Sequence, residues 1–192
     1  MKEKLTLRNA IIWTAALGAL ILFFCSFGAS GSLKGMMEDV YCNFKVHNII
    51  WGCKVVSGTA GGHPMSEILA RSVANAPGII GSILLFLASG GLVAITFLVK
   101  DEKLSKILIF VCAGVMLVAG VLLFFAVEAP WYAYKESLLE QTGIDMPIDV
   151  IKANHPGFKS GSVFAVVGGI FAILFAGGAV ASQFIADKKF IK

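Results

Sequence analysis

The sequence predicts an all-α membrane protein: a bundle of four transmembrane helices with a small disulfide-bonded β-hairpin or sheet in the first extracytoplasmic loop. Of the 192 residues, 57% are hydrophobic and only 15% are charged, and the mean hydropathy is +0.84. This composition lies outside that of ordinary soluble domains. Four long stretches without charged residues or histidine predict the helices, and a short alternating pattern between the first two predicts the hairpin.

The uncharged stretches place the helices at about residues 10–30, 78–99, 107–127 and 161–185. At about 1.5 Å per residue, each is long enough to cross a hydrocarbon core of roughly 30 Å. A chain of this size could not cover four such segments in a soluble core. The first stretch is long for the apolar part of a secretory signal, so we expect it to remain as a helix. Residues 1–192 are expected to form a single membrane domain with outer loops at 31–77 and 128–160.

The distribution of basic residues predicts the orientation. Nine of the 16 lysines and arginines fall in the short N-terminal, middle and C-terminal segments. Positive residues near membrane helices stay on the cytoplasmic side, so both termini are predicted to be cytoplasmic. The plasma membrane is the expected location. No basic surface with interleaved aromatic residues is present in the sequence, and nucleic acid is therefore not an expected partner.

The hairpin is predicted from two alternating runs in the first outer loop. The apolar positions of these runs are Val40, Cys42, Phe44 and Val46, then Ile49, Trp51, Cys53 and Val55. Such alternation is typical of strands. If His47 and Asn48 form a two-residue loop, Phe44 lies opposite Trp51 and Cys42 lies opposite Cys53.

Directly opposed strand residues have Cα atoms about 4.5 to 5.5 Å apart, within the span of a disulfide. The outer compartment is also the oxidising one. We therefore predict a bridge between Cys42 and Cys53. Two unbridged buried cysteines, or a longer loop with a shifted register, are the alternatives, because His-Asn is not the strongest hairpin turn.

Other sequence features point away from catalysis. Cys25 and Cys112 lie inside predicted helices, where cysteine usually packs as a small apolar residue. The three histidines are scattered over the outer loops, and no catalytic residue, metal site or cofactor is predicted. The predicted helices contain no ionisable residue, which argues against proton-coupled transport and voltage sensing.

Small residues in the fourth helix predict close helix packing. Gly161, Ala165 and Gly169 step along one ridge of that helix, and such ridges let helix backbones approach one another. Packing within the bundle is the main expected use, and lateral self-association is a second one. Arg71 and Trp131 stand at the outer ends of helices, where they are expected to support the outer sheet and anchor the interface.

The sequence resembles the claudin and peripheral myelin protein superfamily in three places. These are the pair Cys42 and Cys53, the run Leu69-Ala70-Arg71-Ser72 before the second helix, and the segment from Ala126 to Tyr132 followed by the Gly161-Ser162 entry to the fourth helix. The chain is a divergent case, because residues 31–37 lack the Gly-Leu-Trp triplet of that family. The resemblance implies four helices, cytoplasmic termini and a disulfide-bonded sheet in the first outer loop.

The resemblance implies a non-enzymatic membrane protein that acts through lateral or extracellular protein contacts, in membrane organisation, adhesion or self-assembly. Its partners would be the lipid bilayer and other copies of itself. In this reading Cys42 and Cys53 are structural, and Phe44, Trp51 and Arg71 support the contact surface. The alternative is an accessory subunit of a larger channel, receptor or transporter. A membrane enzyme or a small-molecule transporter is the third hypothesis.

Overall fold

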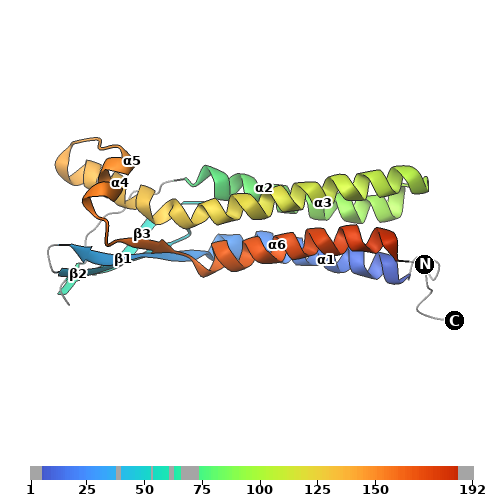
Figure 1. Ribbon diagram of the computed structural model, residues 1–192, viewed down its shortest axis with the longest axis horizontal. Helices are drawn as coiled ribbons and strands as arrows, with labels where there is room; N and C mark the ends of the chain where they lie inside the picture. Colours follow the sequence, from blue (N-terminus) through green and yellow to red (C-terminus); the bar gives the residue numbers. More distant parts are fainter. Residues whose placement is uncertain (1–5, 38–39, 53, 61–62, 66–73, 186–192) are drawn as a thin grey trace. The chain divides into compact units, whose positions relative to one another are not determined.

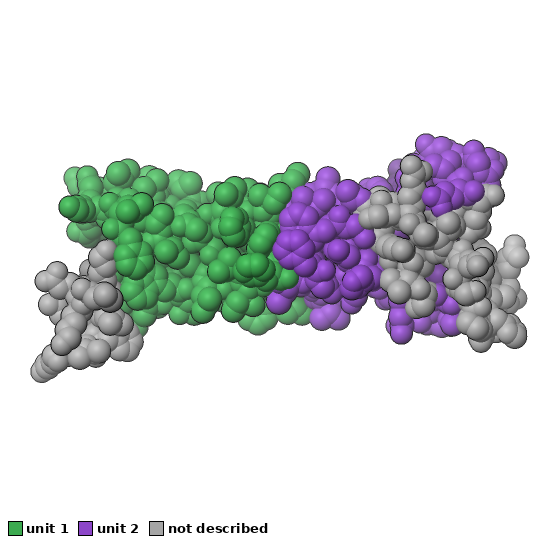
Figure 2. All heavy atoms as spheres, turned by 180° about the vertical axis from the view of Figure 1, so that it is seen from behind, with its two compact units in different colours: residues 1–24, 80–122, 167–192 green, residues 25–79, 123–166 purple. Residues whose placement is uncertain are grey.

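The computed structural model describes residues 6–37, 40–52, 54–60, 63–65 and 74–185. By its internal contacts the chain divides into two compact units. Unit 1 consists of residues 1–24, 80–122 and 167–192, and unit 2 consists of residues 25–79 and 123–166 (Figure 2). Each unit therefore draws on segments that are distant in the sequence.

Among the described residues, four helices are long and apolar enough to cross a membrane, as in an integral membrane protein (Figure 1). They are α1 (Leu7–Cys25), α2 (Ala76–Leu98), α3 (Glu102–Phe125) and α6 (Val163–Ala181). Short 3-10 turns follow three of them, at Ser26–Gly28, Ala126–Glu128 and Ser182–Phe184. The four predicted helices are confirmed in number and order, with ends that differ by a few residues.

A polar side chain caps the N-terminus of each of these helices. The acceptor and backbone donor pairs are Thr6 Oγ1 with Asn9 at 3.2 Å, Asn75 Oδ1 with Gly78 at 3.4 Å, Asp101 Oδ1 with Lys103 at 2.8 Å, and Ser162 Oγ with Ala165 at 3.3 Å. These bonds satisfy N–H groups that a helix leaves unpaired in its first turn. The sequence therefore marks each helix start with a polar residue just before the apolar run.

Within unit 1, neighbouring helices approach closely at small residues. The contacting pairs are Gly18 with Phe175 (α1, α6), Ser89 with Ala16 (α2, α1), Gly91 with Cys112 (α2, α3) and Gly120 with Gly169 (α3, α6). These pairs give the ring order α1–α2–α3–α6. A Cβ atom on Gly18 would fall 2.2 Å from the Phe175 ring, so any side chain here would require the ring to move.

Unit 1 buries many small side chains together with a few large ones, and it exposes many large apolar side chains. Ala19 and Ala119 are fully buried, whereas Leu17, Leu87 and Ile107 are each 59% exposed. Such an apolar surface would be unfavourable in water. Lipid tails are as apolar as leucine, so in a membrane the large side chains can face outward while small residues let the helices approach one another closely. The side-chain arrangement of unit 1 therefore fits a lipid environment.

In unit 2, two further helices follow α3. The 3-10 turn at Ala126–Glu128 leads into α4 (Ala129–Thr142), and α5 (Ile148–Asn154) comes next. Helical structure therefore continues beyond the predicted third helix into the loop predicted at residues 128–160, as far as Thr142. Gly143 ends α4 with a φ of 71°, and its N–H donates to the Leu139 carbonyl at 2.8 Å. This left-handed conformation favours glycine at a helix C-terminus.

Unit 2 also contains a five-stranded antiparallel sheet in the order β4-β3-β2-β1-β5. The strands are β1 (Ser30–Met37), β2 (Val40–His47), β3 (Lys54–Ala60), β4 (His63–Met65) and β5 (Lys159–Gly161). The first four follow one another in sequence, but β5 comes after α5 and pairs Gly161 with Ser32 of β1. The predicted hairpin is thus the centre of a larger sheet, to which the second predicted loop also contributes. Gly161 lies in β5 and not in the fourth long helix.

The predicted register of the hairpin is wrong. The first strand lies where the sequence placed it, but the second begins only at Lys54, and Cys42 lies opposite Ala60. Residues 48–52 form a turn, in which Asn48 has a φ of 51° and its carbonyl accepts the Gly52 N–H at 3.0 Å. Ile49 and Ile50 are both fully buried. A strand would send two successive side chains to opposite faces, so burying both of them favours the turn.

The register also removes the geometric argument for the disulfide. Ala60 occupies the position opposite Cys42 that the two-residue loop assigned to Cys53. Cys53 itself lies outside the described residues. No disulfide joins any two of the cysteines that the structure does describe, Cys25, Cys42 and Cys112. A bridge between Cys42 and Cys53 is therefore not supported.

Candidate interaction surfaces of unit 2

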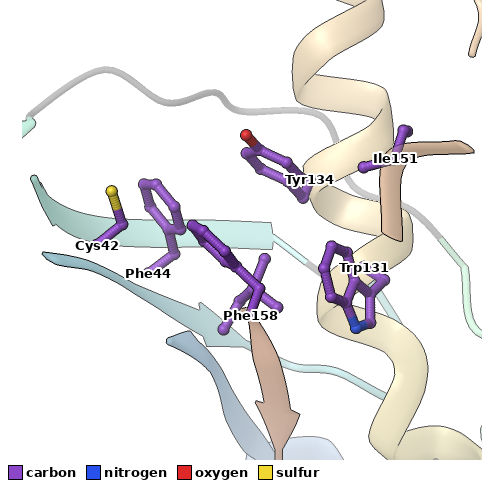
Figure 3. Packing of buried hydrophobic residues seen from close by; sticks show 7 residues of the cluster. Cys42, Phe44, Trp131, Tyr134, Ile151 and Phe158 are labelled. Carbon is purple, nitrogen blue, oxygen red and sulfur yellow. The ribbon is translucent and has the colours of Figure 1, made fainter. Parts of the chain in front are cut away.

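An aromatic core joins the sheet of unit 2 to α4 and α5 (Figure 3). Its buried members are Leu33, Cys42, Phe44, Trp131, Tyr134, Ile151 and Phe158. The ring centroid of Phe158 lies 6.2 Å from those of Trp131 and Tyr134 and 6.5 Å from that of Phe44. Aromatic pairs at this spacing add to the free energy of burial. The core therefore fixes α4 and α5 on one face of the sheet.

Because side chains alternate along a strand, the sheet has a second face, which points away from α4 and α5. Cys42 and Phe44 of β2 are 3% and 5% exposed, whereas their neighbours Tyr41 and Lys45 are exposed. Successive side chains of a strand point to opposite faces, so Tyr41 and Lys45 lie on the side away from α4 and α5. The exposed residues of this outer face are Lys34, Met36, Tyr41, Lys45, His47 and Lys159.

The outer face concentrates positive charge. Lys34 of β1 lies directly opposite Lys159 of β5, and Lys45 of β2 lies opposite Ser32, one same-face position along β1 from Lys34. Within their bounds the five strands contain no Asp or Glu. Like charges directly opposite one another destabilise a sheet. The outer face thus holds three lysines that no carboxylate of the strands balances.

Two large side chains lie beside these lysines. Met36 of β1 is paired with Tyr41 of β2, and they are 57% and 51% exposed. Tyrosine and methionine are enriched in protein interfaces relative to the rest of the surface. The outer face therefore combines three lysines with two large, exposed side chains.

The opposite side of unit 2 is acidic. The segment formed by α4, α5 and their link, residues 129–154, carries four carboxylates and two lysines. We call this segment the helical cover. Its carboxylates are those of Glu136, Glu140, Asp145 and Asp149, and its lysines are Lys135 and Lys152.

Both lysines of the helical cover lie in ion pairs. Lys135 Nζ is 2.8 Å from Asp145 Oδ1. Lys152 pairs with Glu128, just before α4, and its Nζ lies 5.8 Å from the centroid of the Trp131 ring. All four partners of these pairs are partly exposed, so the pairs add little to stability. The ion pairs neutralise the two lysines, so the helical cover keeps a net negative charge.

Trp51, predicted to support the sheet, belongs to the turn after β2. Its indole stacks on Phe27 with centroids 4.8 Å apart, and its Nε1–H donates to Ser26 Oγ at 2.7 Å. Ser26 is fully buried. Trp51 therefore anchors the turn to the 3-10 turn that follows α1.

The predicted site residues fall into separate places. Phe44 and Trp131 meet in the aromatic core, where Trp131 is 4% exposed. Arg71, like Cys53, lies outside the described residues. The two other residues predicted to pack helices, Ala165 and Gly169, lie in α6. Ala165 is fully buried in unit 2, and Gly169 lies against Gly120 in unit 1.

Sequence reasoning missed Lys34, Tyr134 and Phe158, which help to form the outer face and the core. From Ser30 to Gly35, β1 has glycine or leucine at the inward positions and serine or lysine at the outward ones, a weak alternation that did not stand out from a loop. Burial in β2 raises the pKa of the Cys42 thiol, in keeping with a packing role. That role was foreseen only as the alternative to a disulfide.

In the part of the chain that the structure describes, no group of three or more His, Cys, Asp and Glu residues could hold a metal ion. Unit 2 has two oppositely charged surfaces, the outer face and the helical cover. No protein-family model matches the chain, and a search of curated proteins finds no match to it.

Proposed function

We propose that the protein is a non-enzymatic, claudin-like integral membrane protein that acts through protein contacts of unit 2, with another copy of itself as the partner. The observation that carries the proposal is the pair of surfaces on opposite sides of the sheet, one basic and one acidic. Complementary potentials guide association and set the relative orientation of partners. In this proposal the outer face of one copy binds the helical cover of the next.

The basic residues of the sequence support an orientation for this contact. The two ends of the chain and residues 100–106 carry nine of its 16 basic residues, which favours the cytoplasmic side for these segments. Unit 2 then lies outside the cytoplasm, where the plasma membrane is the proposed location. Contacts between copies would form between exposed domains of one membrane or of two facing membranes.

A charge-reversal experiment tests the contact. One variant carries Lys34→Glu and Lys159→Glu on the outer face, and the other carries Glu140→Lys and Asp149→Lys on the helical cover. Each variant alone should associate at least roughly tenfold more weakly than the wild type, because like charges then face one another. An equimolar mixture should regain association, since each variant offers the charge that the other lacks.

The readout is the distribution of oligomers in detergent by native mass spectrometry, measured at low and high salt. Lys103→Glu is the matched control, because Lys103 is an exposed lysine in unit 1 and its reversal should leave association unchanged. Added salt should weaken association of the wild type, since it screens exposed charges. A wild type that stays monomeric in every condition, or variants that associate as it does, would contradict the proposal.

A second candidate function is that of an accessory subunit, favoured by three glycines of the long helices. A Cβ atom on Gly90, Gly114 or Gly177 would meet nothing within 4 Å, so these positions are not used for packing inside the chain. Open small residues allow a foreign helix to approach closely. The assembly should then be recovered from gently solubilised membranes with a larger membrane protein at fixed ratio. Gly114→Leu should release that partner and leave the fold intact.

A further inference from the structure

Unit 1 contains a polar pocket at one end of its helices. The pocket has a volume of about 230 Å³ and is formed by the start of α1, the end of α2 and the start of α3. Ile12, Ile95 and Ile109 form its floor and are at most 6% exposed. Val99 and a set of polar residues form the remainder of the wall. The polar residues are Thr6, Arg8, Asn9, Thr96, Lys100, Glu102 and Ser105.

Two cationic side chains line this pocket from different elements. Arg8 belongs to α1, and its Nη2 donates to Gln183 Oε1 at 2.6 Å, which holds the guanidinium in place. Lys100 lies in the link between α2 and α3 and is exposed. An arginine with up to five donors and a mobile lysine are suited to bind phosphate oxygens.

Two carboxylates near the pocket, among the residues that the structure describes, have partners of their own. Glu102 Oε1 lies 2.9 Å from Lys106 Nζ. Asp101 Oδ1 accepts the backbone N–H groups of Lys103 and Leu104 at 2.8 and 3.2 Å. The cap also occupies the first N–H groups of α3, so a bound anion would be held by side chains and not by the helix end.

The pocket lies beside a surface that suits lipid. Phe97, Leu98 and Leu104, which flank the wall residues in sequence, are 52%, 76% and 47% exposed. Trp13 stacks on Phe97 with centroids 5.9 Å apart, and its Nε1–H donates to Thr96 Oγ1 in the pocket wall at 3.1 Å. Tryptophan with one apolar and one polar contact is typical of the membrane–water interface. A ligand in this pocket would thus have a polar group on the wall and an apolar part beside it.

We propose that this pocket binds the phosphate group of an anionic membrane lipid. Arg8 and Lys100 supply the positive charge, the hydroxyls of Thr6 and Ser105 supply further hydrogen bonds, and the exposed apolar side chains contact the acyl chains. Basic pockets between transmembrane helices commonly take such headgroups. The proposal is independent of contacts made by unit 2.

Native mass spectrometry of the full-length protein in detergent tests the site, with phosphatidylglycerol as the probe and phosphatidylcholine as the zwitterionic comparison. One phosphatidylglycerol per chain should bind more tightly than phosphatidylcholine. Lys100→Gln should weaken phosphatidylglycerol binding about fivefold, the contribution expected of one basic side chain. The double variant Arg8→Gln/Lys100→Gln loses two such side chains and should bind about thirtyfold more weakly. Lys103→Gln, an exposed lysine outside the pocket, should leave it unchanged.

Competition with inorganic phosphate separates the two sources of the anion. If phosphate alone binds with the same dependence on Lys100, the pocket recognises phosphate and needs no acyl chain. If phosphate does not compete with phosphatidylglycerol, the lipid is the ligand. Equal binding of the two lipids together with no phosphate binding, or no loss in the Lys100→Gln variant, would overturn the proposal. The single variant keeps the test valid if replacing Arg8 disturbs the fold, because Lys100 is exposed.

Discussion

Gly120 of α3 faces the carbonyl oxygen of Gly169 in α6, and a Cβ atom on Gly120 would come within 2.9 Å of that oxygen. The same atom would lie 3.0 Å from Ile173 and 3.2 Å from Ala172. Two of the three neighbours thus belong to backbone or to a short side chain that cannot move aside. Replacement of Gly120 has to push the two helices apart.

Gly120→Ala should therefore destabilise unit 1. We expect a loss of about 1–3 kcal/mol in unfolding free energy, the usual cost of overpacking, measured by unfolding in mixed micelles. Gly114→Ala on the same helix is the control, because a Cβ atom there meets nothing within 4 Å. The control should be neutral or slightly stabilising, since alanine is the better helix former. Equal effects of the two variants would refute the close contact.

The aromatic core of unit 2 gives a second prediction. Phe44→Ala should lower stability by about 3–5 kcal/mol, as expected for a large buried aromatic side chain. Tyr41→Ala, one residue before Cys42 on the same strand, should cost far less, because Tyr41 is 51% exposed and Phe44 only 5%. Thermal unfolding followed by near-ultraviolet circular dichroism measures both. A mild effect at Phe44 would mean that the inner and outer faces of β2 are assigned wrongly.

Trp51 makes two separable contacts. Trp51→Phe keeps a ring against Phe27 but loses the hydrogen bond to Ser26 Oγ, so it should cost about 1 kcal/mol, the usual net contribution of one hydrogen bond. Trp51→Ala should cost more, since the stacking is lost as well. Ser26→Ala should cost less in the Trp51→Phe background than in the wild type. Additive losses would show that the two residues are not coupled.

Cys42 provides a prediction for the thiol and its pH dependence. Burial raises its pKa above the ordinary value of 9.0, so the folded state keeps the proton at a pH where the unfolded chain has lost it. The stabilisation is thus present below about pH 9 and is lost as the pH rises further. Stability above pH 9 should fall less in Cys42→Ala than in the wild type.

Alkylation with iodoacetamide tests the same residue directly. The thiolate is the reactive species, so Cys42 should react slowly in the folded protein and rapidly once guanidinium unfolds it. No reductant should be needed for this reaction. A Cys42 that is modified only after reduction would restore the disulfide that the register does not support.

Most of the helical architecture could be predicted because hydropathy and N-terminal capping act locally. The strand β2 was also visible, since its apolar and polar residues alternate in a pattern of period two. The register of β3 was not, because it depends on distant contacts. Ile49 N donates to the Ala29 carbonyl at 3.0 Å, and Asn75 Nδ2 donates to the Ile49 carbonyl at 3.2 Å. Neither hydrogen bond can be predicted from the local sequence pattern.

The surfaces of unit 2 were hidden from sequence reasoning for a related reason. Lys34 and Lys159 stand far apart in the sequence, and only the pairing of β1 with β5 sets them side by side. Phe158, the centre of the aromatic core, precedes a strand of three residues that is too short to be recognised from its pattern. The candidate site therefore depends on pairing between segments distant in the sequence, whereas the transmembrane helices depend on local sequence preferences.

The pairing of β1 with β5 also sets the order in which the protein can fold. Ser162 Oγ donates to the Ser30 carbonyl at 2.8 Å across a separation of 132 residues. During synthesis β1 and β2 emerge long before β5, and loop closure over such a distance is slow. Until Phe158 arrives, the inner face around Leu33 and Phe44 has no complete cover, and a nascent chain with exposed apolar surface is prone to aggregate. Biogenesis of this protein should therefore depend on a chaperone that protects the early strands until translation is nearly finished.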